Sequence, residues 1–392
     1  MRMNEVIRES ILDMIYENDD FKKSIKYIFD VYISNGYELY LVGGAVRDIL
    51  SNKSPKDYDF STNAPIDVTM SLFDKVIPTG LQHGTVTVVI NNISFEVTIF
   101  RKDVESDGRH STIEAAKSIE DDLSRRDFTC NAIAMTFDGE IFDPFNGAED
   151  LANGVVKFVG NPIDRMQEDY LRMLRYFRFH GRIGGNEYDQ DTCNAIKQCA
   201  SGLNQISGER IWNEMGKILS GKNAGDVLYK MYELGVAQVL GLPVSSAARS
   251  QQVNDLCQKV NTPITILAFL LDDIITAQTL HKRWKFSSPE FKLLYWIVGN
   301  KGHLFTLETA QDYVVDGVAK EWVRELAILK HQQSIGNQIM NWVAPEFPVN
   351  GDDLAALGIK PGQQMGQLLK AMKNSWKQSR FTLTKEDLLE QI

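Results

Sequence analysis

Two aspartates separated by a single residue are the first groups in this sequence that could carry out chemistry. Asp57 and Asp59 lie in the segment SPKDYDFST, where Tyr58 and Phe60 take the alternate positions. Because side chains alternate between the two faces of an extended segment, both carboxylates would share one face and both rings the other. Carboxylates at this spacing suit Mg²⁺, which prefers one or two of them together with substrate phosphates. Most such pairs are solvated turns, so the neighbouring motifs must decide between the two interpretations.

A double glycine precedes these aspartates and could bind phosphate. The segment VGGAVRD, residues 42–48, follows the apolar run YELYL and is typical of a strand that turns sharply into a helix. Glycine lets the backbone approach a ligand closely, and the first N–H groups of a helix attract anions. Arg47 adds a forked donor suited to phosphate, whereas the role of Asp48 stays open, since it could hold either the loop or Arg47. Together with the aspartates, this turn predicts a site for a metal-bound phosphate.

A third carboxylate lies on a predicted strand later in the chain. In SFEVTIFR, the apolar residues Phe95, Val97 and Ile99 would face a core and Glu96 the opposite side. If this strand is the neighbour of the one that carries Asp59, Glu96 would complete a carboxylate cluster around two metal ions. The alternative is an ordinary exposed glutamate on a strand.

Three consecutive charges, Arg125, Arg126 and Asp127, enter the otherwise apolar segment DLSRRDFTCNAIA. Charged groups in such a segment usually need partners, and arginine pairs bidentately with phosphate or carboxylate. These residues therefore either contact a ligand or form a structural ion pair between Asp127 and one of the arginines.

The segment QEDYLRMLRYFRFHGR has the spacing of a helix with one charged face. On a helix Asp169 and Arg172 lie three residues apart on one face, Arg175 continues that face, and Arg178 is rotated about half a turn away from Asp169. An acid–base pair at this spacing is usually a surface salt bridge, worth roughly a few tenths of a kcal/mol. The alternative is a ligand-binding face.

Periodicity places these motifs in a mixed fold. Short β-rich runs fill residues 36–145, whereas the remainder shows mainly the spacing of amphipathic helices, including a helix that ends before Gly36. The polar stretch 243–255 is the best candidate for a linker. The chain of 392 residues is long enough for several structural units. We therefore expect an α+β protein in which a small mixed sheet is followed by helices.

The charge of the chain bears on nucleic-acid binding in two ways. A net charge of −10 argues against a large non-specific nucleic-acid binder. Between residues 354 and 380, however, the chain has no acid and five bases, which are Lys360, Lys370, Lys373, Lys377 and Arg380. Such a stretch either contacts phosphates or forms a solvated helix face.

Cysteine spacing and hydropathy limit other classes. The four cysteines lack zinc-site spacing, so we expect buried free thiols. The sequence has no run of about 18 apolar residues that could span a membrane. Its first twenty residues mix acids with apolar residues, unlike a signal or transit peptide. We expect a cytoplasmic protein without a membrane partner.

Taken together, the motifs resemble those of the class II tRNA nucleotidyltransferases, the CCA-adding enzymes of the DNA-polymerase-β-like superfamily. The resemblance covers roughly residues 38–243 and rests on LVGGAVRDIL, SPKDYDFST, HGTVTVVI, FEVTIFR, RRDFTCNAIA, FDPFNGAEDL and EDYLRMLRYFRF. The later GLNQISGERIWNEMGKIL is more similar to mitochondrial and related bacterial CCA-adding enzymes than to the poly(A) polymerases of the same family. Tyr170, where many bacterial members have proline, fits that subgroup. Beyond residue 250 the similarity is looser, although FPVNGDDLAALGIKPGQQMGQLL resembles the family's C-terminal tRNA-contacting segment.

The resemblance implies a nucleotidyltransferase head domain followed by an all-α neck, body and tail. The expected boundaries are 1–35 for N-terminal helices packed on the head, 36–150 for the head, 151–221 for the neck, 222–345 for the body and 346–392 for the tail. It also implies tRNA, CTP and ATP as partners, Mg²⁺ as cofactor, and a monomer or homodimer.

The resemblance further implies a role for each candidate residue. Two metal ions would be held by Asp57 and Asp59, with Glu96 as a less certain third catalytic carboxylate. The triphosphate would be bound by Gly43, Gly44 and Arg47. The nucleotide would be contacted near its sugar by Arg126 and Asp127. The nucleotide-binding helix would contribute Asp169, Arg172, Arg175 and Arg178. The stretch from Asp103 to Ile119, which includes DGRH, matches the family's flexible loop, implied in the switch from C to A addition.

The implied reaction is attack of an RNA 3′-hydroxyl on the α-phosphate of CTP or ATP, after which pyrophosphate leaves. Cytosine and adenine both present an amino donor beside a ring-nitrogen acceptor. A carboxylate at Asp169 and a guanidinium at Arg172 would therefore select these bases against uracil and guanine. The alternatives are a poly(A) polymerase, an enzyme that adds only CC or only A, and a catalytically silent tRNA-binding protein.

Overall fold

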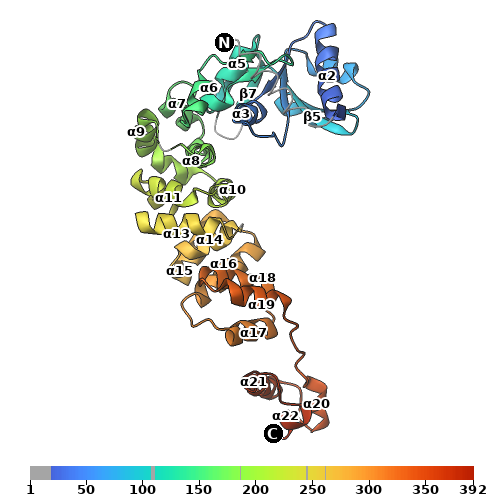
Figure 1. Ribbon diagram of the computed structural model, residues 1–392, viewed down its shortest axis with the longest axis vertical. Helices are drawn as coiled ribbons and strands as arrows, with labels where there is room; N and C mark the ends of the chain where they lie inside the picture. The colour runs from blue at the N-terminus through green and yellow to red at the C-terminus, as the bar shows by residue number, and fades with distance from the viewer. Residues whose placement is uncertain (1–18, 107–110, 186, 244–245, 261) are drawn as a thin grey trace. The chain divides into compact units, whose positions relative to one another are not determined.

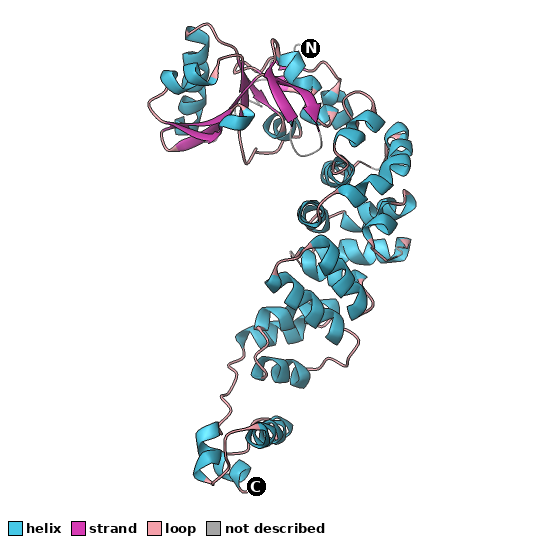
Figure 2. Cartoon of the chain, turned by 180° about the vertical axis from the view of Figure 1, so that it is seen from behind, coloured by secondary structure: helices cyan, strands magenta, loops and turns pink. Residues whose placement is uncertain are grey.

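The computed structural model describes residues 19–106, 111–185, 187–243, 246–260 and 262–392. It forms two compact units, Met1–Asn254 and Asp255–Ile392, and the boundary between them falls within the segment predicted as the body. The first unit contains a sheet and helices, whereas the second is helical (Figures 1 and 2). No helix among the described residues is long and apolar enough to cross a membrane. All four cysteines are buried, and none forms a disulfide with another described residue.

The sheet of the first unit has seven strands among the described residues, in the order β3-β4-β5-β2-β1-β8-β9. Strands β2 and β5 are parallel and all other neighbours are antiparallel, so the sheet is mixed, as predicted. Its strands are β1 Leu39–Val42, β2 Asp59–Thr62, β3 Val76–Gly80, β4 Thr85–Ile90, β5 Ile93–Ile99, β8 Ala134–Met135 and β9 Ile141–Phe142. Outside it, β6 Arg101–Ser106 and β7 Ser111–Ala115 form a hairpin.

Each face of the sheet is covered by an apolar core, because successive side chains of a strand point to opposite faces. Leu41 of β1 packs in one core with α2, Asp19–Ser34, the helix predicted to end before Gly36. Val42 packs in the other core with α5, Ile119–Ser124. The helix predicted within the first 18 residues lies outside the described part of the chain.

The other helices of the first unit are connected by short loops. They are α3 Gly44–Leu50, α4 Ile66–Leu72, α6 Gly147–Ala152, α7 Pro162–Glu168, α8 Arg172–Ile183, α9 Gln190–Cys199, α10 Gly208–Leu219, α11 Ala224–Glu233, α12 Val236–Leu240 and α13 Ala247–Cys257, which ends just past the unit boundary. Short 3₁₀ helices are η1 Leu81–His83, η2 Thr129–Asn131 and η3 Ala200–Gln205. These helices confirm the predicted change from a sheet to helices after about residue 150.

The helix predicted across residues 167–182 is interrupted, which corrects that prediction. Helix α7 ends at Glu168, α8 begins at Arg172, and Asp169 between them has extended backbone angles. The Asp169 carboxylate accepts the N–H of Leu171 at 3.1 Å, a local bond through which aspartate competes with helix formation. Asp169 and Arg172 therefore do not share a face of one helix.

The linker predicted at residues 243–255 is also wrong over most of its length, because α13 begins at Ala247. Alanine, glutamine and arginine favour helices. The helix is anchored by the buried Ser250, whose hydroxyl donates to Asp226 of α11 at 2.7 Å. Polar composition at this position therefore marks a packed helix.

The second unit contains the helices that follow α13. They are α14 Pro263–Leu270, α15 Ile274–Trp284, α16 Ser288–Asn300, α17 Leu307–Val315, α18 Lys320–Leu329, α19 Gln333–Asn341, α20 Gly351–Ala356, α21 Gln363–Gln378 and α22 Lys385–Leu389.

The basic stretch of the second unit is partly used for packing within that unit. Lys373 and Lys377 pair with Asp316 at 3.2 and 2.7 Å, and Arg380 pairs with Asp312 at 3.4 Å. These pairs hold α21 against the end of α17. Only the other two bases of the stretch, Lys360 and Lys370, are exposed, so neither of the two simple interpretations describes the whole stretch.

Candidate active site

Strands β2 and β5 bring three carboxylates into one neighbourhood. Asp59 begins β2 and lies opposite Glu96 in the parallel register, so the condition placed on Glu96 is met. Asp57, Asp59 and Glu96 are all exposed, whereas Phe60 and Phe95 beside them are buried. The predicted alternation of carboxylates and rings is therefore confirmed.

These acids are electrostatically coupled. Although Asp59 is exposed, the surrounding protein partly desolvates its carboxylate, and this raises the pKa of Asp59. The charges of Glu96 and Asp57 raise that pKa further, and the charge of Arg126 opposes them. A divalent cation would offset the repulsion between such carboxylates. Among the described residues, no three acidic, histidine or cysteine side chains form a metal site by themselves. A metal here would need substrate phosphates as additional ligands, which is the ligand set that Mg²⁺ prefers.

The turn between β1 and α3 requires glycine at residue 43. Gly43 has φ 67° and ψ −125°, a combination that residues with a side chain rarely adopt. A Cβ atom there would lie 2.8 Å from Nη1 of Arg126. The predicted strand–glycine–helix turn is present, and it also makes room for that guanidinium.

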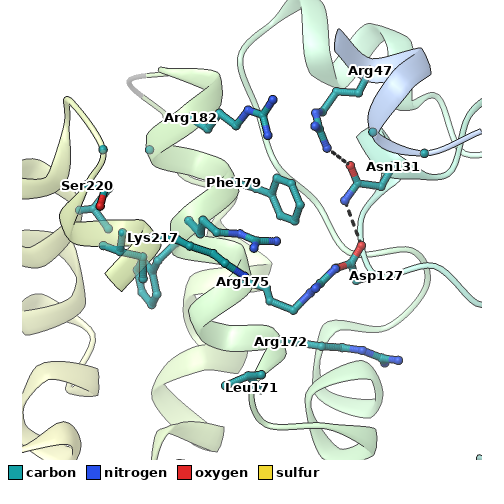
Figure 3. A pocket seen from close by; sticks show the side chains of 18 of the residues that line it. Arg47, Asp127, Asn131, Leu171, Arg172, Arg175, Phe179, Arg182, Lys217 and Ser220 are labelled. Atoms are coloured by element: carbon teal, nitrogen blue, oxygen red, sulfur yellow. Dashed lines mark hydrogen bonds and ion pairs between the residues drawn. The ribbon is translucent and has the colours of Figure 1, made fainter. Parts of the chain in front are cut away.

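Arg47 is held by the adjacent Asp48 and by Asn131 of η2, and Figure 3 shows its contact with Asn131. Its Nε and Nη2 donate to Oδ1 of Asp48 at 3.1 and 2.9 Å, and its Nη1 donates to Oδ1 of Asn131 at 2.6 Å. The other oxygen of Asp48 accepts from Arg182 of α8 at 2.7 Å. Three of the five N–H donors of Arg47 are committed in this way, which leaves two for a ligand. Asp48, whose role the sequence left open, holds Arg47.

Arg125 and Arg126 pair with Asp122 on α5. Its Oδ1 accepts from Nη2 of Arg125 at 2.8 Å and its Oδ2 from Nη2 of Arg126 at 3.1 Å. Burial alone would raise the pKa of Asp122, but the charges and hydrogen bonds of the two arginines outweigh burial and lower it. The ion pair suggested between Asp127 and one of these arginines is therefore wrong.

We expect Asp122→Asn to lower the free energy of unfolding by about 3 kcal/mol at pH 7, because two largely buried guanidinium groups lose their carboxylate. A folded-state pKa below the ordinary 3.8 means that this contribution is present above that value and is lost as the pH falls through the lowered pKa. Urea unfolding at pH 7 and near pH 3 measures both effects, with the exposed Asp121→Asn as matched control. A difference that does not shrink in acid would contradict this explanation.

Asp127 instead joins η2 to α8. Its Oδ2 accepts from Nε of Arg175 at 2.7 Å, and its Oδ1 accepts from Nδ2 of Asn131 at 3.0 Å. Burial would raise the pKa of Asp127, but the charge of Arg175 and the hydrogen bonds from Asn131 and Arg175 lower it. Two predicted site residues from distant segments are thus in direct contact.

Asp169 and Arg172 line one cavity but have separate partners. Oδ2 of Asp169 accepts from Nη2 of Arg210 on α10 at 2.7 Å. Nη1 of Arg172 donates to the carbonyl oxygen of Arg165 at 2.9 Å and to the carboxylate of Glu168. Of the two alternatives for Asp169 and Arg172, the salt bridge between them is therefore replaced by contacts with other residues.

Arg178 lines the same cavity, even though it is rotated along α8. Its Nη1 lies 3.2 Å from Oε2 of Glu214 on α10, and its guanidinium lies 4.5 Å from the ring centre of Phe179. Arg47 and Arg175 lie near the same ring, at 5.1 and 5.7 Å. Phe179 thus gives each of three guanidinium groups a cation–π contact.

One cavity of about 1300 Å³ brings these groups together (Figure 3). Ten of the twelve predicted residues line it, and the other two, Asp57 and Glu96, neighbour Asp59 as described above. The described residues of the lining include twelve arginines and lysines but three aspartates, so the cavity suits a polyanion in spite of the net charge of −10. Arg125, which was predicted as a possible ligand contact without a specific role, also lines the cavity. The bases that were not predicted are Lys53, Lys56, Arg182, Arg210, Lys217 and Lys222.

Sequence reasoning missed the residues that hold the predicted groups in place, which are Asp122, Asn131, Arg182, Arg210 and Glu214. Asp122 could have been found, because it precedes two arginines by three and four residues. Asn131 gave a weaker signal, as a polar residue in an apolar segment that must find a partner. The DGRH tetrapeptide of the predicted loop, residues 107–110, lies outside the described residues.

Comparison with known proteins gives a consistent result. A family model described as "Poly A polymerase head domain" matches residues 39–157, and one described as "Probable RNA and SrmB- binding site of polymerase A" matches residues 187–245. The "CCA tRNA nucleotidyltransferase 1, mitochondrial" of Mus musculus is 38% identical over 95% of this chain and 90% of its own length. The "CCA-adding enzyme" of Ligilactobacillus salivarius is 32% identical over 96% of this chain and 98% of its own. Among solved structures, the Bacillus stearothermophilus CCA-adding enzyme in complex with CTP matches with a TM-score of 0.80 and 27% identity, over 94% of this chain and 97% of that one.

Proposed function

Because this chain belongs to the CCA-adding enzymes, the CCA tRNA nucleotidyltransferases, we propose that its cavity is where a tRNA 3′ end receives C, C and A from CTP and ATP. The observation that carries this proposal is that one cavity contains Asp59, Arg47, Asp169 and Arg172. The cavity therefore offers an acid that can bind a metal ion, an arginine that can bind a triphosphate and two groups that can form hydrogen bonds with a base.

The family's nucleotidyltransferase chemistry implies a divalent metal ion, and the carboxylates here suit Mg²⁺. Asp57 and Asp59 would hold two such ions, and Glu96, opposite Asp59 in the sheet, would be the third catalytic carboxylate. When bound, the metal supplies charge for the attacking and leaving oxygens. The protein's own share of the reaction is to position the nucleotide and to balance its charge.

The phosphate end of the nucleotide would lie near the glycine turn. Gly43 and Gly44 leave the backbone uncovered, and Arg47 has two N–H groups for phosphate oxygens. Arg126, which lies against Gly43, and Asp127 would contact the nucleotide near its sugar. Because Asp48 and Asn131 fix Arg47 in advance, little side-chain entropy is lost when a triphosphate binds.

The base would be read by Asp169 and Arg172. A carboxylate accepts from the amino group of cytosine or adenine, and a guanidinium donates to the neighbouring ring nitrogen. Asp169 accepts from Arg210 through Oδ2 and from the N–H of Leu171 through Oδ1, and each carboxylate oxygen can accept a further hydrogen bond. Both interactions of Arg172 use Nη1 alone. Arg175 and Arg178 complete this wall of the nucleotide site. Uracil and guanine would leave the two groups mismatched.

The remaining expectations concern partners and location. The tail, residues 346–392, would contact tRNA through its exposed bases Lys360 and Lys370, since the other three pair with α17 as described above. The oligomeric state, monomer or homodimer, and the cytoplasmic location stay predictions. The word "mitochondrial" in the names of mammalian relatives offers a specific alternative for the location.

An incorporation assay tests the proposal. The protein should transfer labelled CMP from CTP to tRNA that lacks its terminal CCA, lose this activity with EDTA, and regain it with added Mg²⁺. The same activity in EDTA would overturn the metal assignment. Retention of tRNA without any incorporation would instead favour the catalytically silent tRNA-binding protein.

A further inference from the structure

Asn131 occupies an unusual position between two charged residues of the site. It ends η2, is 7% exposed, and lines the cavity with its amide. On one side its Oδ1 accepts from Arg47 at 2.6 Å, and on the other its Nδ2 donates to Asp127 at 3.0 Å. Asp127 in turn accepts from Arg175 of α8. The four side chains form one hydrogen-bonded chain from the glycine turn to α8 (Figure 3).

The chemistry of the four groups fixes the direction of every bond in this chain. A guanidinium only donates and a carboxylate only accepts, so the residue between Arg47 and Asp127 must accept on one side and donate on the other. A side-chain amide does both. An aspartate would set two carboxylates against each other, and a leucine of similar size would remove one hydrogen bond from Arg47 and one from Asp127.

The hydrogen-bonded series of four side chains connects two ends of the proposed nucleotide site. Arg47 is assigned to the triphosphate, whereas Asp127 and Arg175 are assigned to the nucleoside side. Since all donors and acceptors in between are buried or half-buried, a shift of Arg47 toward a phosphate would be transmitted to Asp127 through a single rigid amide.

We infer that Asn131 is a positioning residue that couples the triphosphate-binding group Arg47 to Asp127 and Arg175, so that both ends of a nucleotide are bound as one unit. This inference rests on the proposed function of the cavity. It assigns no contact between Asn131 and the reacting atoms.

A double-mutant cycle on nucleotide affinity tests the inference. Asn131→Asp breaks this series of hydrogen bonds, because it places one carboxylate against another. Adding Asp127→Asn restores the order of donors and acceptors, because the amide and the carboxylate exchange places in the double variant D127N/N131D. The dissociation constant for CTP is measured by calorimetry without tRNA, and thermal melting checks that each variant is folded. Asn153→Asp, at an exposed residue on the same unit, controls for the added charge.

We expect N131D to weaken CTP binding by about tenfold or more, with N153D close to wild type. The loss in the double variant should be at least about fivefold smaller than the product of the two single losses. Losses that simply multiply, or N131D with wild-type affinity, would overturn the inference. If N131D does not fold, the cycle of N131A and D127A gives the same two outcomes without a new charge.

The outcome is separable from that of the proposed function. If the wild-type protein does not bind CTP, the proposed function of the cavity fails. If it binds CTP and the cycle shows no coupling, only the role of Asn131 fails.

Discussion

Asp59→Asn should reduce nucleotide addition by about a thousandfold or more while the protein stays folded. The carboxylate belongs to the first residue of β2, lies opposite Glu96 and lines the cavity. There it would hold a metal ion that stabilises the charge developing in the transition state by several kcal/mol. Asparagine keeps the size of the side chain but has no negative charge for a divalent cation. The rate of single-nucleotide addition at saturating CTP measures the effect.

Stability should respond in the opposite direction. The pKa of Asp59 is raised in the folded state, so the folded protein binds this proton more tightly than the unfolded chain does. As the pH rises through the raised pKa, the ionised carboxylate therefore opposes folding. Asp59→Asn should leave the unfolding free energy at pH 7 unchanged or slightly higher. The exposed Asp74→Asn is the matched control, and an Asp59→Asn variant that is inactive because it melts earlier would argue against a catalytic role.

Asp169→Ala should relax the choice of base by about 10- to 100-fold, measured as the ratio of kcat/KM for CTP to that for UTP. The carboxylate is the acceptor for the amino group that cytosine and adenine share and uracil lacks. Its loss removes a favourable contact with cytosine and adenine, so that Arg172 alone contacts the base. Addition of C and A should become slower, and misincorporation of U should become detectable.

A matched substitution separates base reading from a general weakening of the site. Asp164→Ala changes an exposed acid on α7 and should leave discrimination at the wild-type level. If Asp169→Ala lowers the rate for every nucleotide by the same factor, Asp169 has a structural role through Arg210 and does not read the base.

Much of the fold and of the site could be predicted from local patterns. The alternation around Asp59 and Glu96 placed their side chains on the correct face, because strand periodicity depends only on neighbouring residues. The turn could be predicted because glycine readily adopts backbone angles that other residues avoid, and Gly43 adopts such angles. Amphipathic spacing gave α2 and α10, since each has one apolar face.

The rest depended on contacts between distant segments. Asp169 had the spacing of a helix residue, yet its bonds to Leu171 and to Arg210 on α10 hold it outside α8. The role of Asn131 becomes apparent only in the folded protein, where Arg47 and Asp127 lie on its two sides. The polar stretch before residue 255 looked like a linker, because the pattern did not reveal that Ser250 would be buried against α11.

Gel-resolved extension of a tRNA that lacks its three terminal nucleotides tests the central claim most directly. We predict that CTP alone adds two nucleotides, that CTP with ATP adds three and then stops, and that UTP and GTP add none. A long A tail formed from ATP alone would contradict this account in favour of a poly(A) polymerase. Addition that always stops after CC, or that adds only A to a tRNA ending in CC, would identify a partial enzyme.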